Sequence, residues 1–271
     1  MRPTVIRRTA IAASAVCLAL LATACGGSDS GGEDKEKTKV EKTEETAPAE
    51  PAAKAKTAAE LEKLALADGD VEGHKVEKAG PDDTIAAKDI SVDKAECEPL
   101  AQALSAAPVG EPGATVRRKA TSEPKKDEEG PSLEELADMT EEEMEEALTA
   151  AFDMTMTLTA LSSYDGEGAG KAVAALRTAA AKCSGGFTAT VSGDKQKVTK
   201  LADESVKGGE EALAWTVTVE QDGEKMPLKL VAVRQGDVLA TFSVINVAAA
   251  GSGKDFDLPT AVVDAQVAKL G

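Results

Sequence analysis

The sequence predicts an α+β domain, with helices packed on one face of an antiparallel sheet, preceded by a signal peptide and a disordered spacer. Long helical patterns precede a run of strands and hairpins, an order typical of helices segregated on an antiparallel sheet. A polar stretch separates this region from an apolar N-terminus. The 271 residues allow one or two domains, and we expect one folded domain over residues 61–271.

The first 24 residues predict a signal peptide. Three arginines precede an apolar stretch over residues 10–21, which is shorter than the ~20 residues that a membrane-spanning helix needs. Residues 21–28 read LATACGGS and resemble the lipobox of bacterial lipoproteins. The resemblance implies cleavage after Ala24, a lipid on Cys25 and an anchor on the extracellular face of the cell membrane. The alternative is a secreted protein in which Cys25 is an ordinary residue.

The composition is acidic and poor in aromatic residues. The chain has 31 Lys or Arg against 48 Asp or Glu, and loss of residues 1–24, with three arginines and no acid, would change the net charge from −17 to −20. Because such a surface repels phosphates, we expect no nucleic-acid partner and a membrane attachment through acyl chains alone. The one histidine, His74, leaves little for a His-based general base or a zinc site. We therefore expect no enzyme activity, metal or cofactor.

Residues 25–60 predict a disordered spacer. Val40 is their only large apolar residue, so the segment cannot bury enough surface to offset the entropy of ordering it. Within the domain, residues 121–150 predict a surface loop followed by an acidic helix, in which Thr140 and Glu143 have the spacing of a capping box. A spacer of this kind would lift a folded domain off the membrane.

Two helical patterns place a cysteine on an apolar face. Cys97 is spaced i, i+3, i+4 and i+7 with other apolar residues of a helix opening near Pro99, and Cys183 ends the apolar face of a helix over residues 169–183. In an exported chain, two such cysteines most simply form a disulfide. The alternative is a pair of buried free thiols.

Strand patterns fill most of the remaining domain. Apolar and polar residues alternate in several segments, and Asp222-Gly223 is typical of a tight hairpin. Pro227 indicates an edge position for its strand, because proline cannot donate to a ladder. The predicted strands cover residues 114–120, 154–160, 187–191, 197–201, 213–219, 226–230 and 238–247, and a last helix carries Val263, Val267 and Leu270 with Pro259 in its first turn.

Three local patterns resemble functional motifs without meeting their requirements. Residues 165–172 look like a phosphate loop, but they lack its first glycine and the Ser or Thr that would bind magnesium. We expect a turn before a helix there. The acids within residues 68–70 and 141–146 lack the spacing that wraps a calcium ion. His74 is expected in a turn or on the surface.

Four further segments carry a recognisable pattern, namely residues 97–100 (CEPL), 181–187 (AKCSGGF), 202–204 (ADE) and 231–238 (VAVRQGDV). In this order they resemble actinobacterial lipoproteins related to the extracellular sensor domain of the PknH-type membrane Ser/Thr kinases. The resemblance implies an α+β domain with a helix-lined cleft beside a curved sheet, suited to ligand binding and without known chemistry. It implies no catalytic residues.

These observations favour a non-enzymatic lipoprotein that displays a ligand- or partner-binding domain in the cell envelope. The partner would be a small envelope molecule or a protein. The alternative is an envelope hydrolase that uses paired carboxylates, which would have to converge in three dimensions. A purely structural role in the envelope is a third hypothesis, and it predicts no cleft.

Overall fold

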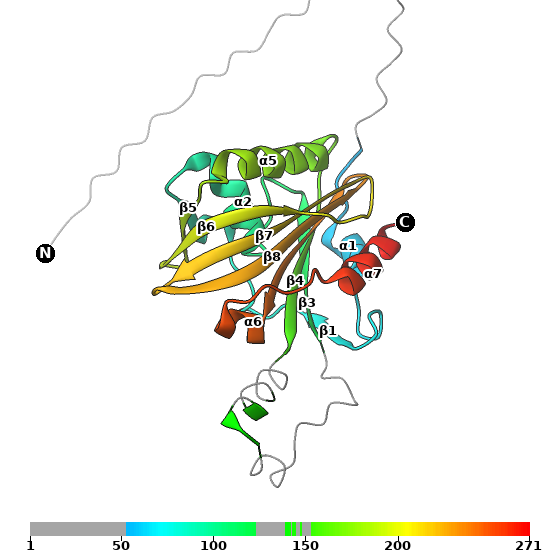
Figure 1. Cartoon of the computed structure of the whole chain (residues 1–271). Helices are drawn as coiled ribbons and strands as arrows, with labels where there is room; N and C mark the ends of the chain where they lie inside the picture. The colour runs from blue at the N-terminus through cyan, green and yellow to red at the C-terminus, as the bar shows by residue number, and fades with distance from the viewer. Residues whose placement is uncertain (1–52, 123–138, 142, 145–146, 148–152) are drawn as a thin grey trace, which may run out of the picture. The chain divides into compact units, whose positions relative to one another are not determined.

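The computed structural model describes residues 53–122, 139–141, 143–144, 147 and 153–271 (Figure 1). The predicted signal peptide, Cys25, most of the spacer and most of the insertion predicted at 121–150 lie outside these residues. Within the insertion, Thr140 and Glu143 do form the predicted capping box, since the Glu143 carboxylate accepts from the Thr140 amide at 2.8 Å and the Thr140 hydroxyl accepts from the Glu143 amide at 3.3 Å.

An antiparallel sheet of nine strands forms most of the described structure. Its spatial order is β1-β3-β4-β9-β8-β7-β6-β5-β2, and consecutive hairpins join β5 through β9. Apolar residues alternate with polar ones toward its edges, whereas the central strands are apolar on both faces. The strands are β1 (His74–Lys78), β2 (Ile90–Val92), β3 (Ala114–Ser122), β4 (Thr155–Ser163), β5 (Phe187–Val191), β6 (Asp194–Glu204), β7 (Glu211–Gln221), β8 (Glu224–Gln235) and β9 (Val238–Asn246).

Helices α2 (Glu98–Leu104) and α5 (Gly168–Cys183) pack on one face of the sheet. Leu100 and Leu176 on these helices share a buried cluster with Trp215 and Leu230 of the sheet. Three further short elements are the 3-10 turns η1 (Ala87–Asp89) and η2 (Ala95–Cys97) and the helix α6 (Val247–Ser252).

The opposite face of the sheet is also covered by helices, which corrects the prediction of helices on one face only. Helices α1 (Ala58–Leu64) and α7 (Thr260–Leu270) bury Leu61 and Val263 against Val231 and Phe242 (Figure 1). The physical reason is that β8 and β9 carry apolar side chains on both faces of the sheet, so both faces need cover. The buried amide of Gln266 joins the two helices by donating to the Leu64 carbonyl at 2.8 Å.

The strands predicted from residue 114 onward are all present, and Asp222 and Gly223 both take positive φ in the predicted tight turn. The edge position predicted from Pro227 is wrong, because β8 lies between β7 and β9. Pairing with β9 begins only at Lys229, so Pro227 lies in a stretch of β8 that pairs with β7 alone. The missing amide is tolerated there for that reason.

The folded chain begins before the predicted boundary at Leu61. Helix α1 starts at Ala58, after a capping box between Thr57 and Glu60. The segment just before it is fixed to the end of β4, where the Lys56 amide donates to the Ser163 hydroxyl at 2.8 Å. Within the part of the chain that the structure describes, no helix is both long and apolar enough to cross a membrane.

Candidate ligand pocket

A cavity of about 390 Å³ lies between helix α2, the loop that includes Asp82 and Ile85, and the face of the sheet that α5 leaves uncovered. Cavities of a few hundred cubic ångströms that are mostly apolar are typical of small-molecule sites. Side chains from β4 to β9 form its floor, and most of them are apolar. The cavity is the candidate functional site.

The floor owes its shape to strand register. Met156 on β4 pairs with Ile245 on β9, and Val219 on β7 pairs with Met226 on β8, so these side chains gather on one face. Met156, Ile245 and Met226 are only half-buried, as is the neighbouring Leu228. A contiguous apolar surface that the protein leaves uncovered usually marks a binding site.

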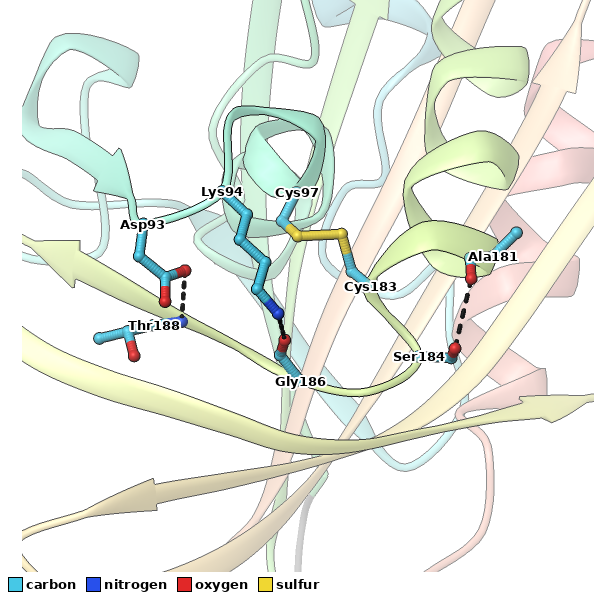
Figure 2. Close-up of a disulfide and its surroundings, with 8 residues drawn as sticks. All are labelled: Asp93, Lys94, Cys97, Ala181, Cys183, Ser184, Gly186 and Thr188. Atoms are coloured by element: carbon cyan, nitrogen blue, oxygen red, sulfur yellow. Dashed lines mark hydrogen bonds between the residues drawn. A yellow bond between two sulfur atoms is a disulfide. The ribbon is translucent and has the colours of Figure 1, made fainter.

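Helix α2 forms the roof, and a disulfide holds its N-terminal end. Cys97 and Cys183 are bonded with an S–S distance of 2.00 Å, and both are 0% exposed, which confirms the predicted disulfide (Figure 2). The bond joins the start of α2 to the end of α5. Because α2 has only seven residues, it would be marginal without such tertiary support.

Two polar contacts fix the strand that follows the disulfide. Lys94 donates from Nζ to the Gly186 carbonyl at 2.6 Å, and the Thr188 amide donates to the Asp93 carboxylate at 2.9 Å (Figure 2). Phe187, which lies between these two contact points, lines the pocket. The disulfide region therefore positions one wall of the pocket as well as its roof.

The C-terminal end of α2 is attached to the sheet by a serine in the pocket wall. The Ser243 hydroxyl on β9 donates to the Leu104 carbonyl at 2.6 Å, which satisfies one of the carbonyls left free at a helix end. Leu104 itself lines the cavity beside Ala101. Both ends of the roof are thus held, one covalently and one by a hydrogen bond.

The rim of the pocket is polar and acidic. Asp82 and Asp83 lie on one side, and Gln196 and Gln221 come from neighbouring positions of β6 and β7. Asp83 accepts from the Gly80 amide at 2.9 Å and from Lys119 Nζ at 3.0 Å, and these two bonds hold the pKa of its carboxyl below its ordinary value. None of the described residues that line the cavity is Lys, Arg or His.

The carboxyl groups of the described chain whose pKa is clearly shifted all have a lowered pKa. A glycoside hydrolase needs a general acid whose pKa is raised, whereas the pKa of Asp83 is lowered. Other carboxyl groups in the described chain also have a pKa that departs clearly from its ordinary value. In each of them the pKa is lowered, chiefly by hydrogen bonds or nearby cations.

A second, more polar groove of about 990 Å³ lies near α6 and the start of α7, and His74 and Asn246 line it. His74 Nδ1 lies 3.0 Å from the Glu72 carbonyl oxygen, and the Asn246 amide donates to Asp153 at 2.6 Å. His74 therefore opens β1 beside a turn, as expected. The described residues contain no group of three or more His, Cys, Asp or Glu arranged to hold a metal ion.

The other motif residues have structural roles. Asp165, in the segment that resembles a phosphate loop, accepts from the Ala55 amide at 2.9 Å, and helix α5 begins at Gly168 as predicted. Asp68 accepts from the Val76 amide at 3.1 Å, and Asp70 pairs with Lys269 at 2.5 Å. These acids anchor turns and helix ends. The pocket residues carried no motif, and the alternation of apolar side chains in their strands was the one available signal.

No family model matches this chain, and no curated protein matches it. Among solved structures, the chain is similar to the extracellular domain of PknH from Mycobacterium tuberculosis, with 14% sequence identity and a TM-score of 0.36. The match covers 82% of this chain and 96% of that chain. At this level the two chains are similar in fold at most, and the function of this chain has to come from its own residues.

Proposed function

We propose that this protein is a non-enzymatic, lipid-anchored envelope protein that binds a small apolar or amphipathic molecule in the pocket beneath α2. The observation that carries the proposal is the 390 Å³ cavity with an apolar floor and a roof held at both ends. Two methionines in the floor suit this role, because the flexible thioether adapts to ligands of different shape.

A small molecule fits the pocket better than a protein partner does. The cavity is concave and within the range of typical ligand pockets, whereas a stable protein interface needs roughly 800 Å² on each partner. The described start of the chain also lies away from the pocket. Lys56 attaches to Ser163 at the far end of β4, seven residues or about 24 Å along the strand from Met156 in the pocket floor.

Filling the pocket should weaken the binding of an apolar probe. N-phenyl-1-naphthylamine, which is uncharged and fluoresces in apolar surroundings, should bind the purified chain saturably. Leu228→Trp replaces an aliphatic side chain in the pocket floor with a bulky indole ring. It should weaken the probe's affinity by about tenfold or more, equivalent to about 1.4 kcal/mol. A fluorescence titration measures both dissociation constants.

The matched control makes the same substitution on the same face of the sheet but outside the pocket. Leu213 on β7 is half-buried and packs against the same cluster without lining the cavity, so Leu213→Trp should leave the affinity within about twofold. Absence of saturable binding to the wild-type chain, or equal affinity of Leu228→Trp and wild type, would contradict the proposed function.

The lipid anchor gives a separate prediction, which rests on the sequence around Cys25. Mass spectrometry of the protein taken from its own cells should show an N-terminus at Cys25 with an acyl-bearing modification, and Cys25→Ala should move the protein out of the membrane fraction. An unprocessed N-terminus in the wild-type protein would refute the anchor. It would not affect the proposal that the pocket binds a ligand.

A further inference from the structure

We infer that the pocket selects cationic and uncharged amphiphiles and rejects anionic ones, an inference that rests on the proposed function. The distribution of charge around the cavity indicates the class of ligand. The floor would hold the apolar part of the ligand, and the rim would hold its polar group. Anionic amphiphiles with the same apolar part would bind less well.

The first observation is the sign of the charges at the rim. Asp82 and Asp83 line the cavity, and no described lining residue carries positive charge. Asp82 is exposed and Asp83 is half-buried, so one carboxylate is in water and the other is next to the apolar floor. A carboxylate or phosphate brought into this rim would lose water and meet charges of its own sign.

The nearby cation does not reverse this balance. Lys119 Nζ lies 3.0 Å from Asp83 and 3.1 Å from Glu77, and Glu77 also pairs with Lys75 at 3.4 Å, so three acids, counting Asp82, stand against two lysines. Those hydrogen bonds raise the pKa of Lys119, which keeps it charged and committed to its two partners. Together with Asp82, the cluster retains an excess of negative charge.

The second observation concerns the uncharged part of the rim. Lys197 on β6 pairs with Glu220 on β7, so Gln196 and Gln221 occupy the next pair of positions along the two strands. Both line the pocket. Their amides offer hydrogen-bond donors and acceptors without net charge, which suits hydroxyl or amide groups of a ligand. An alcohol would therefore be accepted, although less well than an ammonium group.

The third observation is the charge of the whole chain. At a net charge of −17, or −20 after loss of residues 1–24, the protein attracts cations and repels anions over distances up to the screening length, about 10 Å at 0.1 M salt. The long-range field and the two rim carboxylates act in the same direction. Preference for a cation should therefore weaken as salt is raised, while the contribution of the apolar floor should persist.

A series of three molecules with one apolar tail tests the inference. Dodecylamine, dodecanol and dodecanoate, each below its aggregation concentration, compete with N-phenyl-1-naphthylamine for the purified chain near pH 7, where the amine is charged and the acid ionised. We expect the order amine, alcohol, carboxylate, with about tenfold between the first and the last. Asp82→Asn/Asp83→Asn should reduce that ratio to about threefold or less.

The control variant has to change the same charge at a distance from the rim. Asp264 is exposed on α7, which covers the opposite face of the sheet, so Asp264→Asn should leave the order and the ratio almost unchanged. The double variant Asp82→Asn/Asp83→Asn keeps a side-chain oxygen at position 83 that can accept from the Gly80 amide, and thermal unfolding would show whether the loop is intact.

The possible failures are distinguishable. Equal competition by all three molecules, or tighter binding of dodecanoate, would overturn the charge selection and leave the proposed function standing. Binding of the probe without displacement by any of the three would overturn the assignment to amphiphiles. Absence of probe binding would overturn the proposed function itself, and the inference with it.

Discussion

Replacing Cys97 and Cys183 with serine should lower the free energy of unfolding by about 4 to 5 kcal/mol. The disulfide closes a loop with a sequence separation of 86 residues, and the chain-entropy model assigns about this much to a loop of that length. For a domain of this size, each kcal/mol corresponds to roughly 2 to 4 °C in the melting temperature. Urea and thermal unfolding of the double variant would measure both quantities.

The same variant should also bind the pocket probe less tightly. Helix α2 has seven residues, and the disulfide holds its N-terminal end to α5. Loss of the disulfide therefore releases the roof of the pocket. Wild-type protein unfolded and refolded under reducing conditions should match the variant in both stability and affinity. A double variant as stable as the wild type, with unchanged probe binding, would show that the bond contributes to neither.

Removing the charges around Lys229 should be more damaging than removing Lys229 itself. Lys229 has a side-chain exposure of only 3%, and its Nζ lies 2.9 Å from both Glu204 and Asp255. Burial alone would lower the pKa of Lys229, but the hydrogen bonds to Asp255 and Glu204 raise it above its ordinary value. The double variant Glu204→Gln/Asp255→Asn leaves this charge buried and uncompensated, which should cost about 3 kcal/mol.

The comparison variant is Lys229→Met, which keeps a side chain of similar length and removes the charge. Glu204 and Asp255 are far more exposed than Lys229, so water can solvate them when the lysine is gone. We expect this variant to cost less than about 1.5 kcal/mol. Chemical denaturation compares the two variants, and a Lys229→Met that is the less stable of them would contradict the assignment.

The pH dependence of this cluster follows from the same contacts. Hydrogen bonds from Thr216 and Lys229 lower the pKa of Glu204, and Lys229 lowers that of Asp255. Their contribution to stability is therefore present above the ordinary values of 4.5 and 3.8, and it is lost as pH falls below them. The stability difference between wild type and Glu204→Gln/Asp255→Asn should shrink over this range. The pKa of Lys229 is raised, so its contribution to stability is present below pH 10.5 and is lost as the pH rises above that value.

Local patterns were sufficient for the strands from residue 114 onward and for the disulfide. Cys97 and Cys183 could be paired because each sits at the end of an apolar helical face, and such faces have to be buried. The hairpin at Asp222 and Gly223 was predictable because a tight turn needs positive φ at both positions. Patterns of this kind depend on a few neighbouring residues, so they can be interpreted without knowledge of the tertiary structure.

Features that depend on strand order could not be predicted in this way. Pro227 was interpreted as an edge signal, yet its tolerance depends on where pairing with β9 begins. Helices on both faces follow from the packing of α1 and α7, whose patterns do not say which face they will cover. Lys229 carries no sequence signal of its own, and only the structure places Glu204 and Asp255 beside it.

The pocket was hidden from the sequence for a related reason. Met156 belongs to β4 and Met226 and Leu228 to β8, two strands far apart in the chain, and each of these residues looks like an ordinary core residue there. They form a floor because register aligns them and because α2 is too short to cover them. The resemblance to a sensor domain led us to expect a cleft, but it could not indicate which residues line it.

Methyl NMR of the methionines tests ligand binding in the pocket most directly. Of the six methionines, Met156 and Met226 line the cavity, whereas Met139 and Met144 do not. Titration with N-phenyl-1-naphthylamine should shift the methyl resonances of Met156 and Met226 with one saturable dissociation constant, and leave the other two in place. Unmoved resonances for Met156 and Met226 at saturating probe, or equal shifts at all four, would contradict the account.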